Sequence, residues 1–131
     1  MVNKILHSKK GQALVEMAFV LPILILLIMG IVEFGRILNS YLIITNASRE
    51  GARYASIQST DSEIQAVVSN LTVTLDQQDL NVVITPTASN RVSGSSATIR
   101  IDYQINIITP IISNIVPNPF GITAQTTMRV E

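Results

Sequence analysis

Residues 9–34 read KKGQALVEMAFVLPILILLIMGIVEF, so two lysines and a glycine lead directly into a long apolar run. The stretch Met17–Val32 carries no charge, and 11 of its 16 residues are Leu, Ile, Val or Phe. Residues 13–32 reach the roughly 20 residues that cross about 30 Å of hydrocarbon, with Glu16 as the single interruption. The apolar residues favour insertion by about 3–7 kcal/mol, whereas one acid costs about 3 kcal/mol at most. The stretch therefore predicts a transmembrane helix that tolerates a carboxylate near its start.

Charges on the two sides of this run predict its orientation. Residues 1–11 contain three lysines and no acid, whereas Glu33 and Arg36 offset each other just beyond the run. The positive-inside rule then places the N-terminus in the cytoplasm and the C-terminal part outside the cytoplasmic membrane. A cleaved secretory signal is the alternative, but its apolar core is shorter and ends at a small-x-small cleavage site. The residues that follow Gly30 provide no such site.

The composition argues against several classes of function. The chain has 131 residues, no cysteine and one histidine, which excludes disulfides, thiolate metal sites and histidine triads. Nine basic and nine acidic residues give no excess positive charge for binding nucleic acid. Asp76, Asp79 and Asp102 could form carboxylate pairs, but they lie in a predicted turn and strand, where acids are usually solvated. We therefore expect no enzyme, no cofactor, no metal and no small-molecule substrate.

Helical spacing continues beyond the apolar run. Apolar residues recur every three or four positions, which is typical of one helix face, and no proline occurs between Ile23 and Thr85. We predict one helix of roughly 65 Å from about Gln12 to about Ser56, with residues 12–34 in the membrane and 35–56 outside it. Pro22 should kink or loosen one turn. The predicted apolar face of the outer half comprises Phe34, Ile37, Leu38, Tyr41, Leu42, Thr45, Ala52 and Ala55.

Residues 57–131 predict a small head outside the cytoplasm. Thr60 and Glu63 form a capping-box pattern, which marks the start of a second, short helix. Alternating or β-branched runs predict strands at residues 81–85, 97–107 and 122–130, and the prolines between 109 and 120 predict a connection. The expected fold is α+β: a long N-terminal helix, a short second helix, and a three-stranded antiparallel sheet packed on the outer half of the long helix.

Two stretches resemble a known family. Lys-Lys-Gly-Gln-Ala-Leu-Val-Glu at 9–16 and Thr-Asn-Ala-Ser-Arg-Glu-Gly-Ala-Arg-Tyr-Ala at 45–55 are similar to TadE-like pseudopilins of the Tad (tight adherence) systems, within the type IV pilin class. This resemblance implies removal of leader residues 1–11 by a prepilin peptidase that cuts between Gly11 and Gln12. Flp-type major pilins carry an aromatic residue where this chain has Met17, which favours a minor pilin or pseudopilin.

The resemblance also assigns a role to Glu16. Cleavage would give Gln12 a new α-amino group, mostly protonated at neutral pH, and Glu16 lies one helical turn away on the same face. In the pilin class this glutamate is thought to pair with the N-terminus of a neighbouring subunit, which offsets part of the cost of each charge in lipid. Two alternatives stay open: Glu16 could extend to the headgroups, or Gln12 could cyclise and lose its amine.

The second stretch allows two interpretations. Small residues four apart let another element approach closely, and Gly51 would otherwise cost roughly 1 kcal/mol of helix propensity. The stretch could therefore pack on the head's own sheet with a solvated charged edge, or form a docking face for another pilin or assembly subunit. The residues concerned are Ala47, Arg49, Glu50, Gly51, Arg53 and Ala55.

These observations predict a minor pilin, a structural or assembly subunit of a Tad-type (type IVb) pilus or secretion system that serves cell adhesion. Its expected partners are membrane lipid, a prepilin peptidase, other pilins or pseudopilins and Tad assembly proteins. The alternative is an uncleaved single-pass membrane protein whose outward head binds a partner or surface ligand.

Overall fold

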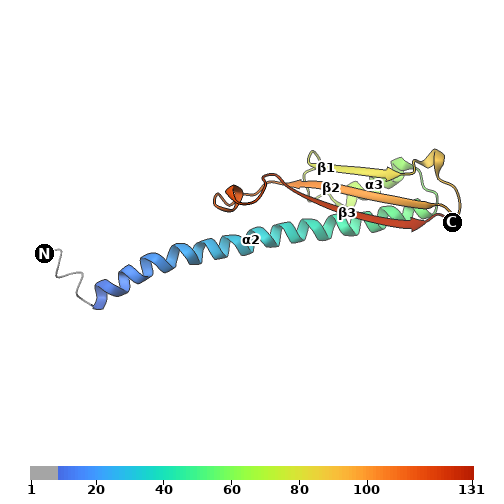
Figure 1. The fold of residues 1–131 in the computed structure, drawn as a ribbon. Helices are drawn as coiled ribbons and strands as arrows, with labels where there is room; N and C mark the ends of the chain where they lie inside the picture. Colours follow the sequence, from blue (N-terminus) through green and yellow to red (C-terminus); the bar gives the residue numbers. More distant parts are fainter. Residues whose placement is uncertain (1–8) are drawn as a thin grey trace.

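The computed structural model describes residues 9–131, in which one long helix carries a small head at its C-terminal half (Figure 1). The part of the predicted leader that precedes Lys9 lies outside the described residues. The helices are α2 (Lys9–Ser56) and α3 (Asp61–Leu71), the strands are β1 (Leu80–Thr85), β2 (Ser96–Ile105) and β3 (Phe120–Arg129), and two short 3-10 turns are η1 (Ala88–Asn90) and η2 (Ile112–Asn114). The predicted α+β fold is confirmed.

Helix α2 is continuous over 48 residues, or about 70 Å at 1.5 Å per residue. It passes through Pro22 without a break, and Figure 1 shows a gentle curve rather than a sharp bend. Proline removes one backbone donor, and membrane helices tolerate this loss. The single helix predicted from about Gln12 to about Ser56 is therefore confirmed.

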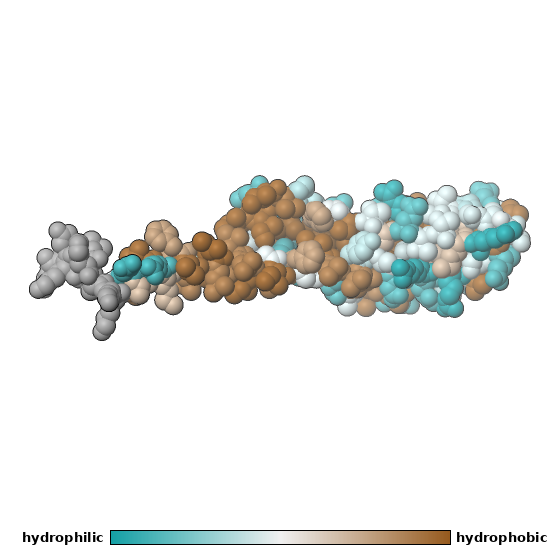
Figure 2. Space-filling model, turned by 60° about the horizontal axis from the view of Figure 1, so that its bottom comes forward, coloured by the Kyte–Doolittle hydropathy of each residue, from teal (hydrophilic) through white to brown (hydrophobic). Residues whose placement is uncertain are grey.

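The two halves of α2 have different surroundings. Apolar side chains of the first half are exposed on every side, with Phe19 and Ile23 exposed by 71% and 70%. Figure 2 shows this apolar surface along the helix. In the second half one face is fully buried, including Ile44 and Ala47. A helix that is apolar all round needs a non-aqueous environment, and the first half of α2 is long and apolar enough to span a membrane.

The sheet has the order β1-β2-β3, with both pairs antiparallel. Its central strand β2 alternates buried and outward-facing residues, because side chains alternate between the two faces of a strand. The buried set on β2 is Ala97, Ile99, Ile101, Tyr103 and Ile105. These side chains form one core with the outer half of α2 and with α3.

Helix α3 begins with the predicted capping box. Thr60 accepts a hydrogen bond from the backbone N–H of Glu63, and the Glu63 carboxylate accepts one from the backbone N–H of Thr60. Ile64 and Val68 then turn toward the core. The buried Arg91 pairs with Asp61, which fastens the loop after β1 to the start of α3.

The predicted apolar face of the outer helix is partly wrong. Phe34, Leu38, Tyr41 and Leu42 are exposed, although each is a large apolar residue. The helix instead buries a face with many small residues, because the sheet and α3 can approach α2 closely only where side chains are small. The buried members of that face are Ser40, Ile44, Ala47, Ser48, Gly51, Ala52 and Ala55.

Strand β2 ends at Ile105 rather than at the predicted Ile107. Ile105 is paired with Phe120, the first residue of β3. Beyond that pair the facing chain holds Pro119, which has no backbone N–H to donate. Instead, the Asn118 side chain accepts a hydrogen bond from the N–H of Ile107 at 3.0 Å and donates one to its C=O at 3.4 Å. These two bonds replace the backbone hydrogen bonds between strands at this position.

Gly51 provides a test of the close packing between α2 and the head. A Cβ on Gly51 would lie 3.2 Å from Val68 Cγ2 and 3.3 Å from Ile99 Cγ2, whereas one on Gly35 would meet nothing within 4 Å. We expect Gly51→Val to lower the free energy of unfolding of the head by about 2–3 kcal/mol through overpacking. Thermal unfolding in detergent, followed by circular dichroism, measures the change.

Gly35→Val is the matched control in the same helix. Valine has a higher helix propensity than glycine, so this variant should unfold at the midpoint of the unmodified protein or slightly above it. Equal midpoints for the two variants would contradict the assignment of Gly51 to the core.

Candidate functional site

The predicted processing site lies at the beginning of α2. Gly11 and Gln12 are in the first helical turns, only two and three residues after Lys9. The side-chain amide of Gln12 donates a hydrogen bond to the Glu16 carboxylate at 3.3 Å. The Gly11–Gln12 bond therefore lies in the first turns of α2.

Glu16 is exposed on the helix surface, one turn from Gln12. The geometry therefore places residues 12 and 16 on one face, as their spacing implies. A carboxylate here can accept a hydrogen bond from its own chain, and its exposure leaves it accessible to a second subunit. Its pairing with a neighbouring N-terminus stays a prediction.

The residues singled out near the end of α2 divide into two groups. The small residues Ala47, Gly51 and Ala55 lie within the protein's own core, where Gly51 meets α3 and β2. Ser48 is buried beside them, and its hydroxyl lies 2.8 Å from the hydroxyl of Thr126 on β3. This group holds the sheet against the helix.

The charged residues of the same stretch lie outside the core. Arg49 and Arg53 are exposed, and Arg53 pairs with the partly exposed Glu50. The hydrogen bond from Arg53 lowers the pKa of the Glu50 carboxyl, and the Arg53 guanidinium also lies 5.4 Å from the centre of the Tyr54 ring. Exposed pairs of this kind contribute little to stability, and a docking role for these side chains stays a prediction.

A shallow hollow of about 240 Å³ lies between α2 and α3, lined by Asn46, Glu50, Val67, Asn70 and Leu71. Small-molecule sites usually enclose roughly 300–1,000 Å³, so this hollow is small for a ligand. Among residues 9–131, no cluster of three His, Cys, Asp or Glu side chains could hold a metal ion.

The sequence did not predict a further site, which lies at Glu33. This carboxylate is 4% exposed and lies 2.5 Å from the Arg36 guanidinium. It also accepts hydrogen bonds from the backbone N–H of Ile108 at 3.3 Å and from the Thr109 hydroxyl at 3.1 Å. Arg36 in turn donates to the carbonyl of Asn106 at 3.5 Å. Two helix side chains thus hold the connection between β2 and β3.

The position of Glu33 explains why it needs three donors. It follows the apolar run directly, and a buried charge is costly unless it is paired and hydrogen-bonded. The sequence signal was an acid at the end of the apolar run with an arginine three residues later. That signal showed the ion pair but not the partners, which come from a connection 75 residues along the chain.

Removing the Glu33 carboxylate should loosen this junction. Glu33→Ala leaves the Ile108 N–H and the Thr109 hydroxyl without their acceptor, and we expect a loss of about 3 kcal/mol in the free energy of unfolding. Glu33→Gln keeps an acceptor of similar shape, and it should lose about 1–2 kcal/mol. Chemical unfolding in detergent, followed by circular dichroism, measures both variants.

Glu50→Ala is the matched control, because Glu50 and Arg53 have the same spacing as Glu33 and Arg36 but lie at the surface. We expect no measurable change in its unfolding midpoint. If the Glu33 and Glu50 variants unfolded at the same denaturant concentration, Glu33 would have no anchoring role.

A comparison with protein families found a match over residues 11–53 to the family described as TadE-like protein. The comparisons with curated proteins and with solved structures found no match. The matched segment begins at Gly11 and covers the apolar run, Glu33 and most of the stretch that ends α2, whereas the sheet lies outside it. It indicates a membrane protein associated with Tad pilus systems. Over residues 11–53 the chain is similar to TadE-like proteins, the family that its two quoted stretches resemble.

Proposed function

We propose that the chain is a minor pilin or pseudopilin, a structural or assembly subunit of a Tad-type pilus or secretion system. The observation that carries the proposal is that the TadE-like segment begins at Gly11 and continues into a helix that is apolar and exposed on all sides. Such a helix requires lipid or other apolar helices around it. The proposed role is structural rather than enzymatic.

Processing at Gly11 would change the charge of the helix end. The leader, residues 1–11, carries three lysines, which hold it at the cytoplasmic face of the membrane. Cleavage removes these charges and leaves one amino group on Gln12, beside the Glu16 carboxylate that already faces that turn. A prepilin peptidase is the proposed partner for this step.

Assembly would then use the apolar surface of α2. One ammonium and one carboxylate are each costly within hydrocarbon, and pairing between subunits offsets part of that cost. The exposed side chains Phe34, Leu38, Tyr41 and Leu42 continue the apolar surface beyond the span. In a shared bundle they would contact the helices of neighbouring pilins, while the head faces outward from the cytoplasmic membrane.

The intact mass of the membrane-extracted protein tests processing. We expect coexpression with the cognate prepilin peptidase to remove residues 1–11, because residues 9–16 resemble the processing site of prepilins. Expression without the peptidase is the control, and it should give the full-length mass.

Two other results are informative. A further loss of ammonia after cleavage would show that Gln12 has cyclised, which would exclude a free amine as the partner of Glu16. Full-length protein in both samples would contradict processing and leave an uncleaved membrane anchor with an outward head.

A further inference from the structure

The connection between β2 and β3 has an unusual composition for a loop. Residues 106–119 read NIITPIISNIVPNP, and the chain carries no charged residue from Tyr103 to Met128. Three isoleucines of this connection, Ile108, Ile111 and Ile115, are exposed by 70%, 50% and 78%. Burial of one such side chain is worth about 1.5–3 kcal/mol, so exposure of all three to water would be unfavourable.

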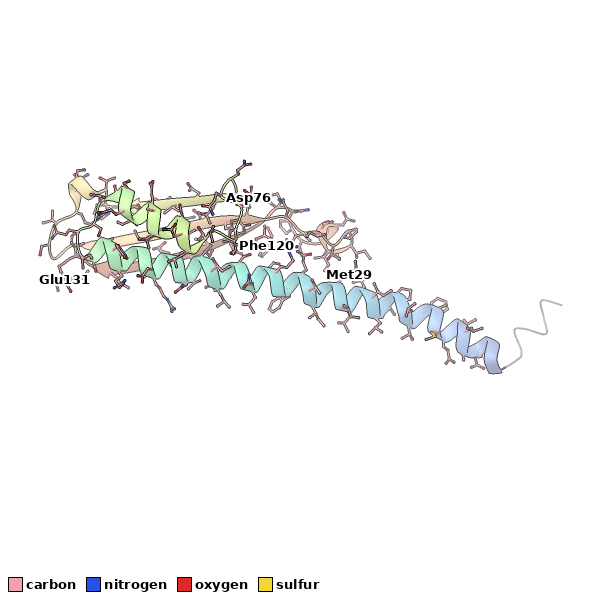
Figure 3. The ribbon with its side chains drawn as sticks, turned by 180° about the vertical axis from the view of Figure 1, so that it is seen from behind. Met29, Asp76, Phe120 and Glu131 are labelled. Carbon is pink, nitrogen blue, oxygen red and sulfur yellow. The ribbon has the colours of Figure 1, made fainter. Side chains whose placement is uncertain are left out.

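This loop lies beside the membrane half of α2 rather than around the head. Figure 3 shows the chain before Phe120 extending along the helix as far as Met29. A Cβ on Gly30 would lie 3.8 Å from Ile112 Cδ1. Ile111 borders a shallow hollow formed by Leu21, Pro22, Ile25, Leu26 and Met29. The loop therefore lies at the level of the apolar run.

The depth of the loop can be measured along the helix. Ile25, at the centre of the residues around Ile111, precedes Glu33 by eight positions, which is about 12 Å along a helix. Half of a hydrocarbon core is about 15 Å. If residues 13–32 span the membrane, Ile111 lies within the hydrocarbon and Glu33 lies at its edge.

The loop also limits the number of free backbone donors. Its turn is closed by hydrogen bonds from the N–H groups of Ser113, Asn114, Ile115 and Val116 to carbonyls within the loop. The Ser113 hydroxyl donates to the Pro110 carbonyl at 2.8 Å, and the prolines at 110, 117 and 119 have no N–H. Non-helical backbone at membrane depth requires this kind of internal pairing.

Glu33 explains how a loop could be held at this place. Its carboxylate accepts the N–H of Ile108 and the hydroxyl of Thr109, the residues at which the chain leaves the head. The polar contacts therefore lie at the edge of the apolar run, and the apolar residues lie beyond them. Figure 2 shows the resulting apolar bulge beside the helix.

We propose that the loop from Ile108 to Val116 inserts into the head-side half of the bilayer beside α2, where lipid acyl chains cover Ile108, Ile111 and Ile115. The head would then be fixed to the membrane at two places, the helix and the loop. This inference rests on the membrane span within the proposed function, but not on cleavage or on filament assembly.

Tryptophan fluorescence tests the insertion, because the chain contains no tryptophan. Ile111→Trp and Ile115→Trp each introduce a single reporter into the full chain, which is reconstituted at low density in phosphatidylcholine vesicles. We expect blue-shifted emission that is quenched by lipids with brominated acyl chains and protected from acrylamide in the water. Two variants are used because Ile115 is the more exposed residue and tolerates the larger side chain more readily.

Two controls separate failure of the loop proposal from failure of the span. Val92→Trp, on an exposed residue of the head, should show the opposite pattern, with water-like emission and strong acrylamide quenching. Phe19→Trp, in the apolar run, should be quenched by the brominated lipids whether or not the loop inserts.

The loop proposal is overturned if Phe19→Trp is quenched by the brominated lipids while both loop variants show water-like emission and acrylamide quenching. It is also overturned if the loop variants emit in the blue but resist both quenchers, since that result would assign the loop to a contact with a second copy of the protein. Water-like emission from Phe19→Trp would overturn the span and the insertion together.

Discussion

Helix α2 meets two different environments along one unbroken series of backbone hydrogen bonds, and the rest of the structure depends on this continuity. Its first half exposes apolar side chains on every side, and its second half buries a narrow face against the sheet and α3. In lipid, a helix satisfies all its backbone groups internally. The same internal pairing would let the helix pass from a membrane into the head without a break.

The junction between the two environments is marked by a buried carboxylate. At the end of the apolar run, Glu33 forms an ion pair with an arginine and accepts hydrogen bonds from a backbone N–H and a hydroxyl. The bonds to Ile108 and Thr109 join the helix to the connection between β2 and β3, the most apolar loop in the described head. A charge placed here is satisfied by the protein, so neither lipid nor water has to solvate it.

Much of the fold could be predicted from local patterns. The capping box at Thr60 predicted the start of α3, and the alternation of apolar and polar residues from Ile99 to Ile105 predicted the central strand. The buried face of α2 could not be predicted in the same way, because large apolar residues occur around more than one side of the helix. Small residues such as Gly51, rather than large ones such as Leu42, determine which side the sheet can approach.

The sequence predicted that Gln12 and Glu16 lie on one helix face, but it did not predict the loop contacts of Glu33. The spacing of Gln12 and Glu16 is a local property of a helix, and the structure places them in contact. Two partners of Glu33, Ile108 and Thr109, are separated from it by 75 and 76 residues, and no local pattern indicates such contacts. The prolines between Thr109 and Phe120 predicted a connection, but the position of that connection beside α2 depends on the tertiary fold.

Amide hydrogen exchange of the vesicle-reconstituted protein tests the continuity of α2 most directly. The account predicts protection without a gap from the apolar run through Glu33 and Arg36 to Ile44, because one helix passes from the membrane to the head. Rapid exchange over residues 33–40 between two protected segments would contradict it, since the span and the head would then be separate units joined by a flexible hinge.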